Sequence, residues 1–253
     1  MKNLHLLRPA AAVLAVVLTA GCTKSLPHSD LSVPREETTL HEMTFTASFG
    51  EGKTTRTTVS LENETKVLWS PKDEIKVFCR GNDAKFTATN STEAAVAEFT
   101  GTVTPGGSSA EDGYAYHAVY PYQDKAAFDG RYFSATLDAD QKSPEGSFQD
   151  DRFITIARSG DTSLAFYNVC SGLRFQVGWS DVSKVTFTAT AGEPIAGKVS
   201  AAFDETGLPA VNKVSEGKSS ITLTPEQGQY FKPGVWYYLV THRPNWKRVS
   251  PSP

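Results

Sequence analysis

The chain has 253 residues, of which 39% are hydrophobic and 11% aromatic, and its formal net charge is -3. This length allows one large or two ordinary β domains, and the aromatic content favours a folded body over a disordered one. Lysine and arginine form no basic stripe along the chain, so we expect no nucleic-acid partner.

The first residues have the form of an export signal. A short basic start is followed by the apolar run 9–18. That run is shorter than the roughly 20 apolar residues that a permanent membrane helix needs. Residues 1–21 are therefore predicted to be a signal peptide.

Small residues lead up to Cys22, and this pattern resembles the processing site of bacterial lipoproteins. Thr19 stands where such sites usually carry leucine, with Leu18 one place further out. We expect Cys22 to be the mature N-terminus and to carry acyl chains such as palmitate, each buried methylene adding about 0.8 kcal/mol of membrane affinity. The alternative is an ordinary secretory signal with an incidental cysteine, which implies the same compartment without the anchor.

Residues 22–39 are polar and contain two prolines, as expected of a tether between a lipid anchor and a folded body. From Met43 onward the dominant signal is a period of two, and turn-forming clusters of Gly, Pro, Asp and Glu separate the alternating segments. No window has a helical period. The fold class is therefore predicted to be all-β, with antiparallel β-sandwiches. The expected strands are 43–49, 66–69, 74–79, 85–89, 96–103, 117–120, 153–157, 173–177, 185–190, 196–203, 221–224 and 236–241.

A domain boundary is predicted within the polar segment Arg158–Thr162, which separates two strand-rich regions. It gives an N-terminal domain at 40–160 and a C-terminal domain at 161–253. A hairpin loop within one domain would have the same composition, so this alternative stays open.

Several motifs occur in an order that resembles a known family. The first half has a Phe-Thr-Ala strand at 45–47, a Thr-Arg loop at 55–56 and a Trp-x-x-x-Asp-x-Ile turn at 69–75. The second half adds blocks at 166–175, 192–197 and 231–238. Together they resemble the fimbrillin-like proteins, which are pilus subunits and related surface lipoproteins of Gram-negative anaerobes.

The resemblance implies two tandem β-sandwich domains of the transthyretin-like kind. It also implies a fimbrial subunit at the cell surface or in a fimbrium, lipid-anchored in the outer membrane and active in adhesion or pilus assembly. Its partners would be other fimbrial subunits, joined by strand exchange after a protease removes the first strand. Arg56 best matches the position of that cleavage, and Arg35 is the alternative.

The end of the chain departs from the family. The proline-broken segment 242–253 stands where further strands would be expected, so the second domain is expected to be incomplete. Proline cannot donate to a strand ladder, and this tail would make a poor donor. The sequence therefore predicts a chain that accepts a strand and donates none.

A solitary carbohydrate-binding outer-membrane lipoprotein, with a host or glycan ligand, is the alternative function. The residues that suggest it are tyrosines that alternate along a predicted strand, which would stack on sugars if they were exposed. Core packing is the preferred reading, because aromatic residues dominate β-sandwich interiors. These tyrosines are Tyr114, Tyr116, Tyr120 and Tyr122.

Catalytic chemistry is not expected. His117 lies in a predicted strand and belongs to no metal-binding or catalytic pattern, so it is read as a packed or surface histidine. Asp73 is expected to bond the backbone of its own turn. The acids Asp138, Asp140, Asp150 and Asp151 are read as solvated loop residues rather than calcium ligands or glycosidase carboxylates. We therefore predict a non-enzymatic protein with no cofactor and no metal.

Two cysteines remain in the body of the chain. Cys79 alternates with apolar residues on a strand, and Cys170 precedes another. Two buried free thiols are preferred over a long-range disulfide, although an exported protein could form one.

Overall fold

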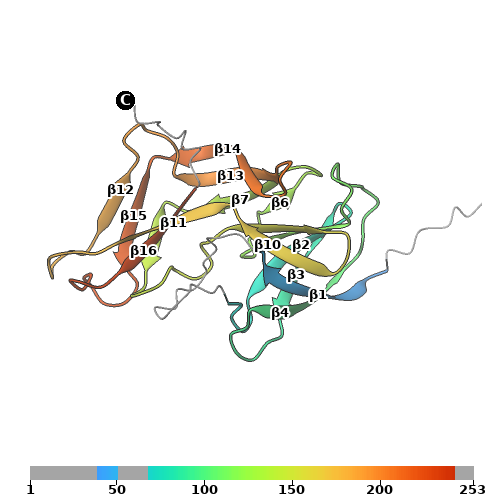
Figure 1. Cartoon of the computed structure of the whole chain (residues 1–253), viewed down its shortest axis with the longest axis horizontal. Helices are drawn as coiled ribbons and strands as arrows, with labels where there is room; N and C mark the ends of the chain where they lie inside the picture. The colour runs from blue at the N-terminus through green and yellow to red at the C-terminus, as the bar shows by residue number, and fades with distance from the viewer. Residues whose placement is uncertain (1–38, 51–67, 243–253) are drawn as a thin grey trace, which may run out of the picture. The chain divides into compact units, whose positions relative to one another are not determined.

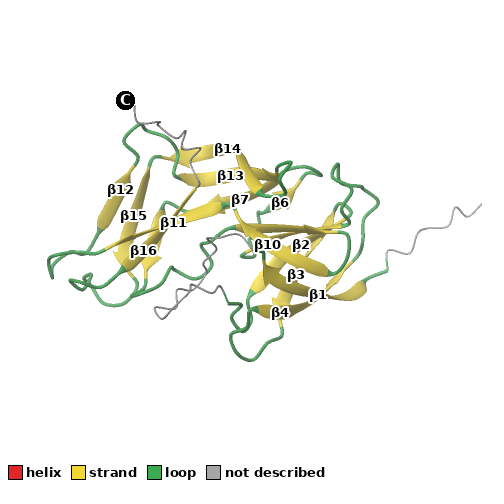
Figure 2. Cartoon of the chain, viewed as in Figure 1, coloured by secondary structure: helices red, strands yellow, loops and turns green. Residues whose placement is uncertain are grey.

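The structure, a computed structural model, describes residues 39–50 and 68–242 (Figure 1). All regular structure within these ranges is β-strand (Figure 2), which confirms the predicted all-β class. In the same ranges no helix is long and apolar enough to cross a membrane. Cys22, Arg35 and Arg56, with the predicted signal peptide and most of the tether, lie outside the described residues.

The first group of strands closes into a barrel in the order β1-β10-β9-β5-β2-β3-β4. Neighbours are antiparallel except β1 and β10, which run parallel. The barrel strands are β1 (His41–Phe49), β2 (Glu74–Cys79), β3 (Asn82–Ala88), β4 (Val96–Val103), β5 (Tyr116–Tyr120), β9 (Thr155–Ser159) and β10 (Ser163–Asn168).

The other strands form three smaller sheets, in the orders β11-β16, β12-β15-β8 and β14-β13-β7-β6. Their bounds are β6 (Ala127–Phe128), β7 (Phe133–Leu137), β8 (Asp140–Ser143), β11 (Cys170–Phe175), β12 (Val185–Thr188), β13 (Ala196–Phe203), β14 (Pro209–Lys218), β15 (Ser220–Pro225) and β16 (Tyr237–His242). β8 pairs with β15 in parallel and the other pairs are antiparallel.

Two hydrophobic cores share the barrel strands β2, β5 and β9. Successive side chains of a strand point to opposite faces. In β5, Ala118 belongs to the core inside the barrel, and the next residue, Val119, belongs to the core formed with the smaller sheets. The same alternation holds for Val77 and Phe78 in β2. These three strands therefore bury apolar side chains on both faces.

The predicted boundary at residue 160 falls in the turn between β9 and β10, which are neighbours in the barrel. Pairing crosses this position in both directions. β7 and β8 precede it and pair with β13 and β15, whereas β10 follows it and pairs with β1. Two sandwiches in tandem, divided at 160, are therefore not confirmed, and this loop is a hairpin loop, as the alternative reading of the sequence allowed.

Both body cysteines are free and buried, as preferred from the sequence. Cys79 belongs to the barrel core and Cys170 to the second core. Burial raises the pKa of Cys79, and it raises the pKa of Cys170 to about 12. Both side chains therefore behave as small apolar core residues rather than as reactive thiols.

Candidate functional site

β1 completes the barrel. It is antiparallel to β4 along nearly its whole length, from His41 opposite Val103 to Ser48 opposite Val96, and its second half is parallel to β10. Figure 1 shows β1 in blue beside β4. A backbone hydrogen bond of 2.8 Å from Gly50 N–H to the Phe166 carbonyl ends the pairing with β10. We call the place that β1 occupies between β4 and β10 the β1 slot.

The side chains of β1 alternate between the core and solvent. Phe45 and Ala47 are fully buried, Met43 and Phe49 are partly buried against the same core, and Thr44 is exposed. The Phe45 ring lies 5.1 Å from the Phe86 ring and 5.1 Å from the Tyr116 ring, both edge-on. The slot therefore accepts a strand with large apolar residues on either side of one small residue.

Two motif parts that are separate in the sequence, the Phe-Thr-Ala strand and the turn that begins at Trp69, meet in this slot. The Phe49 ring stacks on Trp69 with centroids 4.2 Å apart. Trp69 is fully buried and also contacts the rings of Phe99, Tyr120 and Phe166. The expected role of Trp69 as a packing anchor is confirmed, and its partners include the inner face of β1.

Asp73 bonds the turn that leads into β2, as predicted. Its carboxylate accepts a hydrogen bond of 2.8 Å from Ser70 N–H and one of 3.3 Å from the Tyr120 hydroxyl. It also lines a cavity of about 290 Å³ together with Asp150 and Asp151. Burial raises the pKa of Asp73 to about 6, the Ser70 hydrogen bond opposes this rise, and the charge of Asp151 adds to it.

Replacing Asp73 by asparagine is expected to flatten the dependence of stability on pH. The folded-state pKa of Asp73, about 6, lies above the ordinary aspartate pKa of 3.8, so the ionised carboxylate destabilises the fold at neutral pH and wild-type stability rises as the pH falls from about 6 to about 4. The variant Asp73→Asn should be more stable at pH 7.5 by about 1–2 kcal/mol, after allowance for partial solvent exposure.

Urea unfolding of both proteins at several pH values between 4 and 8 measures this effect. Parallel stability curves for wild type and Asp73→Asn would contradict the assignment. Ser70→Ala is a suitable control, because it keeps the backbone N–H that Asp73 accepts from.

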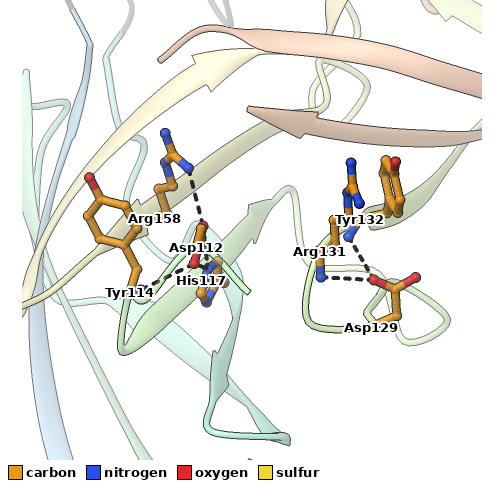
Figure 3. A network of polar contacts seen from close by, with 7 residues as sticks. All are labelled: Asp112, Tyr114, His117, Asp129, Arg131, Tyr132 and Arg158. Carbon is orange, nitrogen blue, oxygen red and sulfur yellow. Dashed lines mark hydrogen bonds and ion pairs between the residues drawn. The ribbon is translucent and has the colours of Figure 1, made fainter. Parts of the chain in front are cut away.

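A second polar cluster surrounds Asp112 on the surface of the barrel. Figure 3 shows its carboxylate between Arg158 and His117. The Nε2 atom of His117 is 3.1 Å from each carboxylate oxygen, and the Arg158 guanidinium is 3.3 Å from one of them. Tyr114 N–H donates to the same carboxylate at 3.1 Å.

This cluster has a structural role. His117 is buried and stacks on Phe128 with centroids 4.0 Å apart, and its pKa is lowered chiefly by burial. The Arg158 guanidinium lies 4.8 Å from the Tyr114 ring and 4.5 Å from the ring of Phe203 in β13. The cluster thus joins the barrel strands β5 and β9 to the sheet that contains β13, and of the two predicted alternatives, a packed or a surface histidine, His117 is the packed one.

The four tyrosines of the predicted strand differ in burial. Tyr120 is buried, and the Tyr116 ring packs against Phe45. Tyr114 is covered on one side by Arg158 and Tyr122 lies beside Lys85. The preferred interpretation, core packing, is confirmed for Tyr116 and Tyr120, whereas Tyr114 is exposed and Tyr122 is half-buried.

The predicted loop acids are not gathered into a metal centre. Asp138 is paired with Arg152, and Asp140 lies on β8. Among the described residues, no group of three or more His, Cys, Asp or Glu side chains is arranged to hold a metal ion.

Comparison with known proteins adds no relative. No family model, curated protein or solved structure matches the chain. The candidate site therefore depends on the geometry of the β1 slot. The sequence motifs indicated β1 and Trp69, whereas β10, which forms the other wall of the slot, was not predicted as a strand.

Proposed function

We propose that this chain is a lipid-anchored surface subunit that assembles with other subunits by exchange of its first strand. The observation that carries the proposal is that β1 fills a slot between β4 and β10 and closes the barrel. Its motifs resemble those of fimbrillin-like proteins, in which loss of the first strand leaves a groove for another subunit's strand.

Removal of β1 would strongly favour the binding of another strand in the β1 slot. The fully buried Phe45 would leave the core, and burying such a side chain contributes about 1.5–3 kcal/mol. The facing edges of β4 and β10 would also lose their backbone partners. Unpaired edges beside an apolar groove favour the addition of another strand.

The chain is suited to losing β1 by one cut. β1 ends at Phe49 and β2 begins at Glu74, so only the segment between them joins β1 covalently to the rest of the barrel. Arg56 lies in this segment, outside the described residues, and is the preferred cleavage position. Cys22 would anchor the uncut precursor in the outer membrane, and the cut form would be free to enter an assembly.

Mass spectrometry of the protein from the cell surface tests this function. The proposal predicts a precursor that begins at lipidated Cys22 and an assembled form that begins at Thr57, with the β1 segment absent. If assembled material kept β1 covalently attached, or if the chain occurred only as monomers, the proposal would fail.

A further inference from the structure

The sequence of the first strand recurs in a second strand. Residues 44–47 in β1 and residues 186–189, which begin in β12, have the same sequence Thr-Phe-Thr-Ala. Each is preceded by an apolar residue, Met43 in β1 and Val185 in β12. Both segments alternate in the same phase, with the phenylalanine on the inner face and the threonines more exposed.

The two copies of this sequence have very different surroundings. β1 lies between two neighbours, and its Phe45 and Ala47 are fully buried. Among the described strands, β12 pairs only with β15, at the edge of its sheet, and Phe187 and Ala189 are only partly buried. The same side chains would therefore bury more apolar surface in the β1 slot than they bury in β12.

β12 is a short edge strand of four residues, but within it the charges, proline and bulges that protect other edge strands are missing. Charged residues, proline and bulges discourage edge strands from pairing with other chains. β14, the edge of the neighbouring sheet, has Pro209, Lys213 and Glu216 and pairs irregularly with β13. By contrast, residues 185–191 contain no charge and no proline.

The connections of β12 allow it to leave its sheet. Residues 176–195 join β11 to β13, and β12 is the one strand within them. Releasing β12 breaks its pairing with β15 but leaves β11 paired with β16 and β13 paired with β7 and β14. In the β1 slot, the β12 segment would pair with two strands, β4 and β10, instead of with β15 alone.

We propose that the β12 segment of a second copy of this chain is the donor strand that fills the β1 slot after β1 is lost. This inference rests on the proposed function. β12 and the slot lie in different sheets and far apart in Figure 1, so the contact joins two different patches of the subunit. A head-to-tail contact of this kind does not have to close into a ring, and repeated contacts then build an open filament. The proline-broken tail then need not be the donor, and this proposal replaces the sequence-based prediction of a chain that donates no strand.

The position of Ala47 provides selectivity in the slot. Ala47 lies opposite Ala97 of β4, and both side chains are buried. Ala189 is the corresponding residue of the β12 segment and is partly exposed in its own sheet. A phenylalanine at 189 should therefore be tolerated in β12 and rejected by the slot, whereas one at the exposed Thr186 should be tolerated in both.

The test uses the full chain with a specific protease site introduced within residues 51–67. After cutting, native gels record self-assembly, and fluorescein-labelled peptides 41–50 and 183–192 are tested for binding. We expect oligomer ladders from the cut wild type and the cut Thr186→Phe variant. In cut Ala189→Phe, assembly should fall at least about tenfold, the size of an overpacking penalty, and peptide 183–192 carrying that change should bind correspondingly weakly.

Thermal unfolding provides the folding control, because Ala189→Phe should melt within about 3 °C of wild type. If Ala189→Phe assembles as wild type does, or if the cut chain binds peptide 41–50 but not peptide 183–192, β12 is not the donor and the proposed function still stands. If the cut chain binds neither peptide and does not assemble, the proposed function itself fails, and this inference fails with it.

Discussion

Replacing Phe45 by alanine is expected to lower the free energy of unfolding by about 3–5 kcal/mol, as is usual when a buried phenylalanine is truncated. Phe45 is fully buried and contacts Phe86 and Tyr116 across the barrel interior. The loss of the ring leaves a cavity beneath β1, the strand that closes the barrel. The packing of β1 against the rest of the barrel is therefore weakened. Urea unfolding followed by circular dichroism measures the effect.

Thr44→Ala is the matched control, because Thr44 is the adjacent residue on the exposed face of β1. Its effect should stay within about 0.5 kcal/mol. Equal effects of the two changes would show that β1 is not packed in the alternation described here.

Replacing Trp69 by alanine is also expected to lower the free energy of unfolding by about 3–5 kcal/mol. Trp69 is fully buried and contacts Phe49 from β1, Phe99 from β4 and Phe166 from β10. Its removal therefore loosens both walls of the β1 slot and the strand within it. The same unfolding experiment gives the magnitude.

Trp69→Phe separates packing from hydrogen bonding. The Trp69 Nε1 atom is buried and has no hydrogen-bond partner among residues 39–50 and 68–242, so phenylalanine loses volume but none of the described contacts of a polar group. We expect a cost of about 1–2 kcal/mol, well below that of alanine. A cost for Trp69→Phe as large as that for Trp69→Ala would contradict the assignment of Trp69 to packing alone.

The strands that were predicted have a clear apolar pattern, but β7 and β10 have one too and were not predicted. The predicted ranges 74–79, 96–103 and 196–203 agree with β2, β4 and β13. β8 and β14 were not predicted, because their sequences are polar. In β8 the buried Gln141 side chain donates a hydrogen bond of 2.7 Å to the Val240 carbonyl in β16 and accepts one of 3.0 Å from the Val240 N–H. A polar side chain therefore occupies a core position there.

The architecture depends on pairings between distant residues, which periodicity does not reveal. The parallel pairing of β1 with β10 joins residues 46–49 to residues 163–166, and it closes the barrel across the predicted domain boundary. The sequence indicated the inner face of β1 through its alternation and Trp69 through its turn. It could not indicate which strands form the walls of the slot, because an alternating pattern identifies a buried face and not its neighbours.

The most direct test of the central claim is to measure whether β1 can be replaced. A chain cut within residues 51–67 is mixed with a fluorescein-labelled peptide of residues 41–50, and fluorescence anisotropy follows its uptake. We expect the cut chain to bind the peptide stably and the uncut chain not to bind it. A peptide carrying Phe45→Asp should not bind to the cut chain. A folded cut chain that excludes the peptide, or one that takes up the wild-type and Phe45→Asp peptides equally, would contradict it.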